Sequence, residues 1–258
     1  MKLTLLGTGT SFGVPVIGCD CAVCRSEDRR DKRTRCAALI EMAGKTLLID
    51  TPPELRLQLL AAGTQSVDAV LYTHTHADHI AGIDDLRAFS DRRDRPLPLY
   101  GSGETLATLR TSHRYIFDAG MKPLPGTTKP ELELHELVAG REVEVAGVPV
   151  LPLGFPHGRL TVLGFRIGGM AYVTDVKEVP AAVREQLRGL DLLVLNALRY
   201  RPHPTHLSID DALAVVQDLK PGRAVFTHLT HETGHAELAA KLPAGVEPGY
   251  DGLTVEIG

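Results

Sequence analysis

The most restrictive feature of this chain is the segment THTHADH at residues 73–79, which crowds three histidines and an aspartate together. It directly follows the apolar run VDAVLY, the pattern of a buried strand. Alternate side chains of an extended segment point the same way, so His74 and His76 should share one side, and Asp78 and His79 should converge from another direction. Neutral imidazoles and carboxylates are the usual ligands of zinc and similar divalent ions, so the segment predicts a site for one or two metal ions.

Three later positions repeat one arrangement, in which a ligand-type residue comes just after an apolar run. His157 follows VPVLPLGFP, Asp175 follows MAYVT and His228 follows RAVFT. Taken singly, an aspartate at a strand end is often a turn former or a helix cap, and a histidine there is often only exposed. Taken with residues 73–79, they predict that ligand types gather at one edge of a sheet.

The bulk composition fits a folded α/β protein and excludes several classes. The chain has 258 residues, enough for a sizeable core, and we expect residues 1–258 to form one domain. Its net charge of −4 argues against a globally basic nucleic-acid binder, and no apolar run has the length of a membrane span. The opening MKLTLLGTG lacks the long apolar core of a signal peptide, so we expect it to be the first strand of a cytoplasmic protein.

Short apolar runs alternate with amphipathic segments, which is typical of α/β architecture. The strand-rich middle of the chain favours mixed sheets over a plain doubly wound sheet. Three segments give specific expectations: a helix that begins just past the histidines and continues through residues 84–90, an amphipathic helix over 208–219, and a loop or flap over 121–136, which contains three prolines.

The chain resembles the metallo-β-lactamase-fold hydrolases through four segments that occur in the order of that family's motifs. They are THTHADH (73–79), FPHG (155–158), VTD (173–175) and FTH (226–228). The resemblance covers nearly the whole chain and implies a four-layer αβ/βα sandwich, in which two mixed β-sheets are flanked by helices and carry a binuclear metal centre. It implies one ion on His74, His76 and His157, another on Asp78, His79 and His228, and Asp175 as a bridge between them.

This ligand set implies a particular chemistry. Two cations about 3.5–4 Å apart lower the pKa of a bridging water, which gives hydroxide at neutral pH, and they stabilise charge on the oxygens of a phosphodiester. The presence of His79 and Asp175 favours the phosphodiesterase and glyoxalase-type branches of the family. The ligand types suit zinc or manganese, and iron or cobalt as well, so the sequence leaves the native metal open.

Three cysteines, at Cys19, Cys21 and Cys24, form a C-x-C-x-x-C cluster that suits a structural zinc. Such a site needs a fourth ligand, for which we choose His231 first and His235 second. Free thiols or a redox pair are the alternative. The cluster, the GTGTSFGVP turn and the closing GYDGLTVEI resemble the phosphodiesterases of the bacterial carbon–phosphorus lyase pathway, which open phosphoribosyl 1,2-cyclic phosphate.

His206 lies just before the predicted helix over 208–219, where Ser208 is a suitable N-cap. A lone histidine in a loop is normally exposed and has no special role. Its position nevertheless resembles that of the general-acid histidine in the phosphodiesterase branch and in tRNase Z, which implies that it protonates the leaving alkoxide or stabilises the phosphoryl oxygens. His113, His135 and His203 are assigned no role.

The leading hypothesis is a binuclear metal-dependent phosphodiesterase that acts on a small or cyclic phosphodiester, with Asp78 and His206 as its catalytic residues. A tRNase Z-like endoribonuclease shares the metal ligands and His206, but the net charge argues against it. A glyoxalase II-like thioester hydrolase gives no reason for the cysteine cluster. A non-catalytic metal-binding protein would need a degraded ligand set. A homodimer is expected only by analogy with the family.

Overall fold

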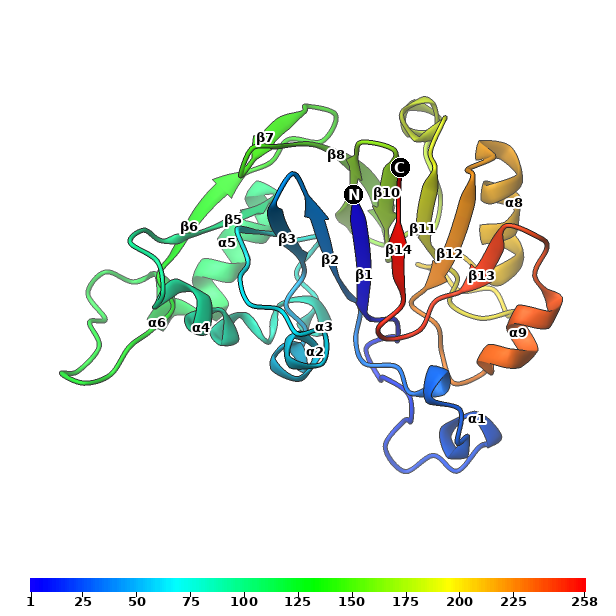
Figure 1. The fold of residues 1–258 in the computed structure, drawn as a ribbon, viewed down its shortest axis with the longest axis horizontal. Coiled ribbons are helices and arrows are strands. Elements are labelled where there is room, and N and C mark those ends of the chain that lie inside the picture. The colour runs from blue at the N-terminus through cyan, green and yellow to red at the C-terminus, as the bar shows by residue number, and fades with distance from the viewer.

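The first half of the chain, together with the last strand, builds a seven-stranded sheet. The computed structural model describes residues 1–258, and its terminal strands β1 and β14 pair side by side (Figure 1). The strand order is β14-β1-β2-β3-β4-β5-β6. The strands are β1 (Lys2–Gly7), β2 (Ala37–Met42), β3 (Lys45–Ile49), β4 (Ala69–Leu71), β5 (Leu97–Gly101), β6 (Leu132–Glu136) and β14 (Thr254–Glu256).

The second half builds another seven-stranded sheet, in the order β13-β12-β11-β10-β9-β8-β7. Strands β10 to β13 run parallel, whereas β7 to β10 pair in antiparallel fashion, so the sheet is mixed as predicted. The strands are β7 (Val143–Val145), β8 (Val148–His157), β9 (Leu160–Ile167), β10 (Met170–Val173), β11 (Leu192–Asn196), β12 (Arg223–Thr227) and β13 (Val246–Pro248).

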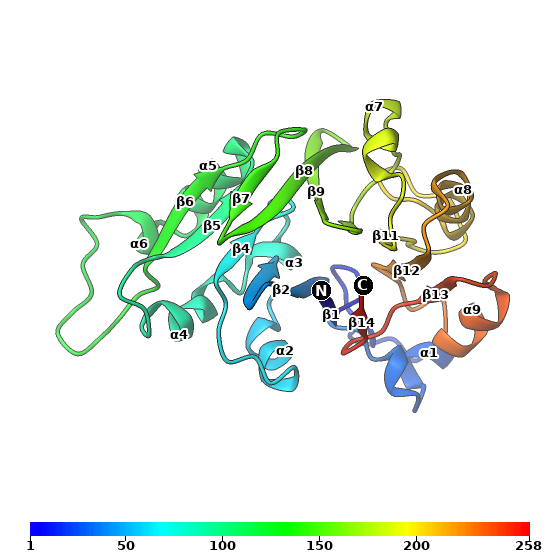
Figure 2. The ribbon, with the colours of Figure 1, turned by 45° about the horizontal axis from the view of Figure 1, so that its top comes forward.

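Helices cover the outer side of each sheet (Figure 2), which confirms the four-layer sandwich. No helix combines the length and the apolar character needed to cross a membrane. The helices are α1 (Ala22–Arg25), α2 (Leu55–Ala61), α3 (Ala77–Ile80), α4 (Arg87–Ser90), α5 (Gly103–Ser112), α6 (Arg114–Phe117), α7 (Ala181–Arg184), α8 (Ile209–Leu219) and α9 (His235–Lys241), with 3-10 turns at Arg29–Asp31, Ile83–Leu86 and Glu185–Leu187.

The central core lies between the two sheets. Leu5 and Ile40 of the first sheet pack there with Tyr172, Val194 and Val225 of the second, and all five are buried. Side chains alternate in direction along a strand, so the other faces are free to pack against the outer helices. Two further buried clusters do this, one beneath α2 and α5 and the other beneath α8.

Helix α8 matches its sequence prediction closely. Ser208 is the N-cap, its hydroxyl accepts a hydrogen bond from the Asp211 amide, and the Asp211 carboxylate accepts one from the Ser208 amide. This reciprocal capping satisfies backbone amides that a helix start leaves unpaired. The helix therefore begins one residue after Ser208 and fixes the end of the loop that carries His206.

Two segments correct the sequence predictions. The single helix expected to run through 84–90 is instead broken into α3, a 3-10 turn and α4. Gly82 lies at the break, where a Cβ atom would come within 2.1 Å of the Pro52 carbonyl oxygen, so close packing on the segment after β3 interrupts the helix. The loop predicted over 121–136 ends early, because residues 132–136 form β6 along β5. The three prolines lie before that strand.

Candidate metal centre

The structure brings the histidine segment and its distant partners together at one edge of the two sheets. Each of these residues ends a strand or closely follows one, and the strands concerned direct their carboxyl ends toward this edge. His74 and His76 follow β4, Asp78 and His79 lie in α3, His157 ends β8, Asp175 follows β10 and His228 follows β12.

Four overlapping groups of ligand-type atoms form there, and two of them match the sets that the family resemblance implied. Within each group the atoms lie within 4.8 Å of one another. In the first group the His74 Nε2 and His76 Nδ1 atoms are 3.0 Å apart. The first group is His74, His76 and His157, and the second is Asp78, His79 and His228.

Asp175 lies between the two groups. Its Oδ2 atom is 3.4 Å from His79 Nε2, and its Oδ1 atom is 3.1 Å from His228 Nε2. The same carboxylate also lies within reach of His74 of the first group. One carboxylate that faces both groups is the arrangement that a bridging ligand requires.

The electrostatics of these groups favour a bound cation. Burial alone would raise the pKa of Asp175, but His228 and His79 hold it well below its usual value. Burial alone would lower the pKa of His79, but the carboxylates of Asp175 and Asp50 raise it well above its usual value. Carboxylates that attract a proton to His79 would attract a metal cation in the same way.

The remaining imidazoles suit metal ligation. Burial lowers the pKa of His74 and His157, which favours the neutral form that binds metal ions. His79 Nε2 and both ring nitrogens of His228 are buried without a hydrogen-bond partner of good geometry in the chain. Buried polar atoms are costly when unsatisfied, so this set of nitrogens and carboxylates fits two divalent ions.

A second set of residues contacts the Nδ1 atoms of three of these imidazoles and orients their rings. Asp50 Oδ2 lies 2.7 Å from His79 Nδ1, Thr73 Oγ1 lies 3.0 Å from His74 Nδ1, and His157 Nδ1 donates to the Thr205 carbonyl at 3.1 Å. Asp50 was not among the residues predicted from the sequence. Asp50 directly follows β3 and so repeats the pattern of a ligand-type residue after an apolar run. That pattern could have identified it from the sequence.

His206 lies at the edge of the metal groups. Its Nε2 is 3.0 Å from Asp175 Oδ1, and its Nδ1 is 3.0 Å from Thr205 Oγ1 and 3.1 Å from His203 Nδ1. Burial lowers the pKa of His206, against the opposing effect of the Asp175 hydrogen bond. His203, to which the sequence analysis gave no role, therefore lies directly behind His206. His113 and His135 lie elsewhere, away from the metal groups.

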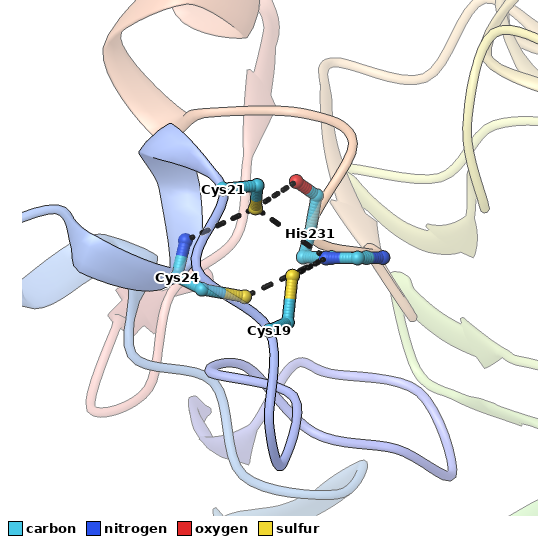
Figure 3. A group of neighbouring side chains, drawn as sticks. All are labelled: Cys19, Cys21, Cys24 and His231. Carbon is cyan, nitrogen blue, oxygen red and sulfur yellow. Dashed lines mark hydrogen bonds between the residues drawn. The ribbon is translucent and has the colours of Figure 1, made fainter.

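The cysteine cluster closes around His231 (Figure 3). The Sγ atoms of Cys19, Cys21 and Cys24 lie 3.3, 3.5 and 3.5 Å from His231 Nδ1. The pKa of Cys21 is lowered to about 6, chiefly by a hydrogen bond from the Cys24 amide, which favours the thiolate that binds metal. Burial raises the pKa of Cys24 to about 11, an effect that a cation beside the sulfur would oppose.

The alternative fourth ligand, His235, lies outside this cluster. Its backbone amide donates to Asp31, and its ring packs edge-on against Tyr250. Of the two histidines considered from the sequence, the structure therefore brings only His231 to the cysteines. Cys36 also lies apart, buried just before β2.

Comparisons with known proteins agree with this arrangement. The Beta-lactamase superfamily domain matches residues 45–229. The crystal structure of a new diphosphatase from the PhnP family aligns with a TM-score of 0.91 and 42% identity over 98% of this chain and 96% of that chain. A ribonuclease Z of Mycobacterium bovis (strain BCG / Pasteur 1173P2) is 27% identical over 291 residues, which cover 100% of this chain and 98% of that protein.

Another relative is much longer than this chain. An octanoyltransferase of Porphyromonas gingivalis (strain ATCC BAA-308 / W83) is 45% identical over 256 residues. The match covers 98% of this chain but 51% of that protein, so the chain spans about half the length of this relative.

Proposed function

The chain belongs to the beta-lactamase superfamily, and from that premise we propose that it is a two-metal phosphodiesterase that hydrolyses a small or cyclic phosphodiester of the phosphoribosyl cyclic phosphate type. The observation that carries this proposal is the imidazole of His206, whose Nε2 lies 3.0 Å from Asp175 beside the complete ligand set. The likeness to a PhnP-family diphosphatase at 42% identity supports a phosphate compound as the substrate.

The proposed ligands divide between two ions, zinc or manganese. When bound, such a pair supplies an activated water and stabilises charge on the attacking and leaving oxygens of a phosphodiester. Asp175 must be anionic to face both ions, and its lowered pKa keeps it so. Asp50, Thr73 and the Thr205 carbonyl fix the ring orientations of His79, His74 and His157.

His206 has the task of delivering a proton. Thr205 and His203 contact its Nδ1 and hold the ring, so that Nε2 faces the metal groups. A proton held at Nε2 would pass to the leaving alkoxide as the P–O bond breaks. The same N–H would otherwise stabilise negative charge on a phosphoryl oxygen.

We also propose that Cys19, Cys21, Cys24 and His231 hold one structural zinc. Three sulfurs and one imidazole nitrogen form a closed set of four ligands, which is the number that structural zinc prefers. The ion would tie the loop before α1 to the segment that follows β12 and carries His228.

Turnover assays with purified, metal-loaded protein test the proposed function. We expect hydrolysis of bis(p-nitrophenyl) phosphate and of ribose 1,2-cyclic phosphates in the presence of Mn²⁺ or Zn²⁺, and at least about 100-fold less with His76→Ala, since that variant removes a ligand of the first group. Activity equal to that of the His76→Ala control would contradict the proposal. Selective cleavage of a tRNA precursor, or of a thioester, would point instead to a ribonuclease Z-type or a glyoxalase-type enzyme.

A further inference from the structure

A second pocket opens beside the metal groups, toward the cysteine cluster. The metal pocket has a volume of about 370 Å³ and the neighbouring one about 290 Å³. Ser11, His206 and His228 line both pockets, so the two adjoin at these residues. His206 is the proposed proton donor to the leaving oxygen. A leaving group protonated by His206 would have its oxygen at this boundary, and the second pocket would offer space for the rest of it.

Two walls of this second pocket come from the two segments that the cysteine cluster joins, and the rest, including Arg199, comes from residues 198–206. Phe12 and Val16 belong to the loop before Cys19, and Thr230 and Glu232 flank His231. The contact between His231 and the three cysteines therefore holds both walls in place.

The charged residues of the second pocket are Arg199 and Glu232. They form an ion pair in which Arg199 Nη1 lies 3.1 Å from Glu232 Oε1. Arg201, which does not line the pocket, makes two hydrogen bonds to the Glu232 carboxylate. Its Nη2 donates to Oε1 at 2.7 Å and its Nε donates to Oε2 at 3.2 Å. Glu232 thus accepts hydrogen bonds from both guanidinium groups. Two guanidinium groups thus share one carboxylate, and one positive charge is left over.

Arg199 retains unused hydrogen-bonding capacity. Only its Nη1 contacts Glu232, and its Nε is buried without a hydrogen-bond partner in the chain. A buried donor without a partner is destabilising, and such a group in a native structure calls for an explanation. A guanidinium with free N–H groups is suited to binding a phosphate or carboxylate.

We propose that Arg199 is a specificity-determining residue that selects substrates whose leaving group carries a second anionic group, such as a phosphate monoester. This inference rests on the proposed function, because the scissile phosphodiester must lie at the metal groups. The side chain of Arg199 is 25% exposed, which is enough for contact with a ligand. His203, which also lines the pocket, offers a further ring beside the anion.

Two substrates that differ only in the second anion test this directly: ribose 1,2-cyclic phosphate and its 5-phosphate. For the wild-type enzyme we expect kcat/KM to be about 10- to 100-fold higher for the phosphorylated substrate, the range expected of hydrogen bonds to a charged group. Arg199→Gln should bring the ratio of the two values close to one. Arg199→Lys should keep part of the preference, since it retains the charge without the planar fork.

Arg201→Gln is the matched control, because Arg201 contacts the same carboxylate from outside the pocket. It removes one positive charge from the same carboxylate but no group that lines the pocket, so we expect a smaller loss of preference than in Arg199→Gln. Equal loss of preference in Arg199→Gln and Arg201→Gln would overturn the proposal in favour of general charge attraction. A wild-type ratio near one would overturn it as well. If the wild type turned over neither substrate, the proposed function itself would fall, and this inference with it.

Discussion

Three residues of the site adopt a backbone conformation that non-glycine residues rarely adopt. Asp50, Asp175 and His228 have φ values of 62°, 59° and 57°. Each comes directly after a strand or within two residues of its end, and the left-handed turn swings its side chain toward the metal groups. Such conformations cost on the order of 1–3 kcal/mol each and cluster at functional sites. The presence of three such residues at one site supports a functional role for that site.

The role of His206 predicts a dependence on the leaving group. His206→Ala should lower kcat by about 100-fold or more on a ribose cyclic phosphate, because an alkoxide needs a proton as it leaves. The loss on bis(p-nitrophenyl) phosphate should be less than about tenfold, since p-nitrophenolate leaves readily without one. Steady-state kinetics on both substrates provide the comparison. Equal losses would show that His206 acts otherwise than as an acid.

Asp50 predicts an effect on metal affinity. It accepts from Thr73 through both the backbone amide and the hydroxyl, each at 2.8 Å, and contacts His79 at 2.7 Å. Asp50→Ala should therefore weaken metal binding by about 10- to 100-fold, as removal of an orienting partner usually does. Competition with a chromogenic chelator measures this. Unchanged affinity in a folded Asp50→Ala protein would show that His79 needs no such support.

Among the structural elements, the candidate metal ligands could be predicted because they lie in short segments after apolar strands. It was enough to expect that the carboxyl ends of the strands meet at one edge of a sheet. That expectation alone places segment 73–79 beside the residues after β10 and β12. Asp50 shows the same pattern and was missed, because a lone aspartate there reads as a turn former. The role of His203 depends on a contact with His206, which no spacing reveals.

Element boundaries were less predictable, since tertiary contacts decide them. The helix expected through 84–90 breaks where Gly82 packs against the Pro52 carbonyl, a contact between segments far apart in sequence. Strand β6 lies at the edge of its sheet and pairs with β5, so its formation depends on a neighbour rather than on a strong apolar pattern. The choice of His231 over His235 was likewise settled by the position of the loop after β12.

The cysteine cluster predicts a measurable change in metal content. Cys21→Ser removes a ligand and should lower the tightly held metal by about one ion per chain, while the exchangeable metal stays near two. It should also lower kcat/KM on ribose cyclic phosphates, because His231 and the wall that carries Val16 lose their common anchor. Elemental analysis before and after dialysis against a chelator checks the first part. An unchanged total in a folded variant would contradict the zinc site.

At the scale of the whole molecule, Asp251 ties the end of the chain to its beginning. The carboxylate accepts hydrogen bonds from the Thr8 hydroxyl at 2.8 Å and from the Thr34 amide and hydroxyl at 2.7 and 2.6 Å. Asp251 belongs to the GYDGLTVEI segment, whose final strand, β14, pairs with β1. This segment resembles part of a known family, but the sequence alone did not predict the hydrogen bonds that Asp251 makes.

Asp251 also predicts a pH dependence of stability. Burial raises its pKa from 3.8 to about 6, against the opposing hydrogen bonds from Thr34 and Thr8. The folded state therefore binds this proton more tightly, and the resulting stabilisation is present below pH 3.8 and lost as the pH rises through about 6. Asp251→Asn cannot titrate, so wild type should lose stability relative to it between pH 4 and 7, by at most about 3 kcal/mol. Urea unfolding across that range checks this, and parallel pH profiles would contradict it.

Folding gathers residues from both halves of the chain into what we propose is a centre for two metal ions. Anomalous diffraction from a crystal grown with excess Mn²⁺ tests it most directly. We predict two peaks on either side of Asp175, one among His74, His76 and His157 and the other among Asp78, His79 and His228. A single peak, or none within coordination distance of these residues, would contradict the account.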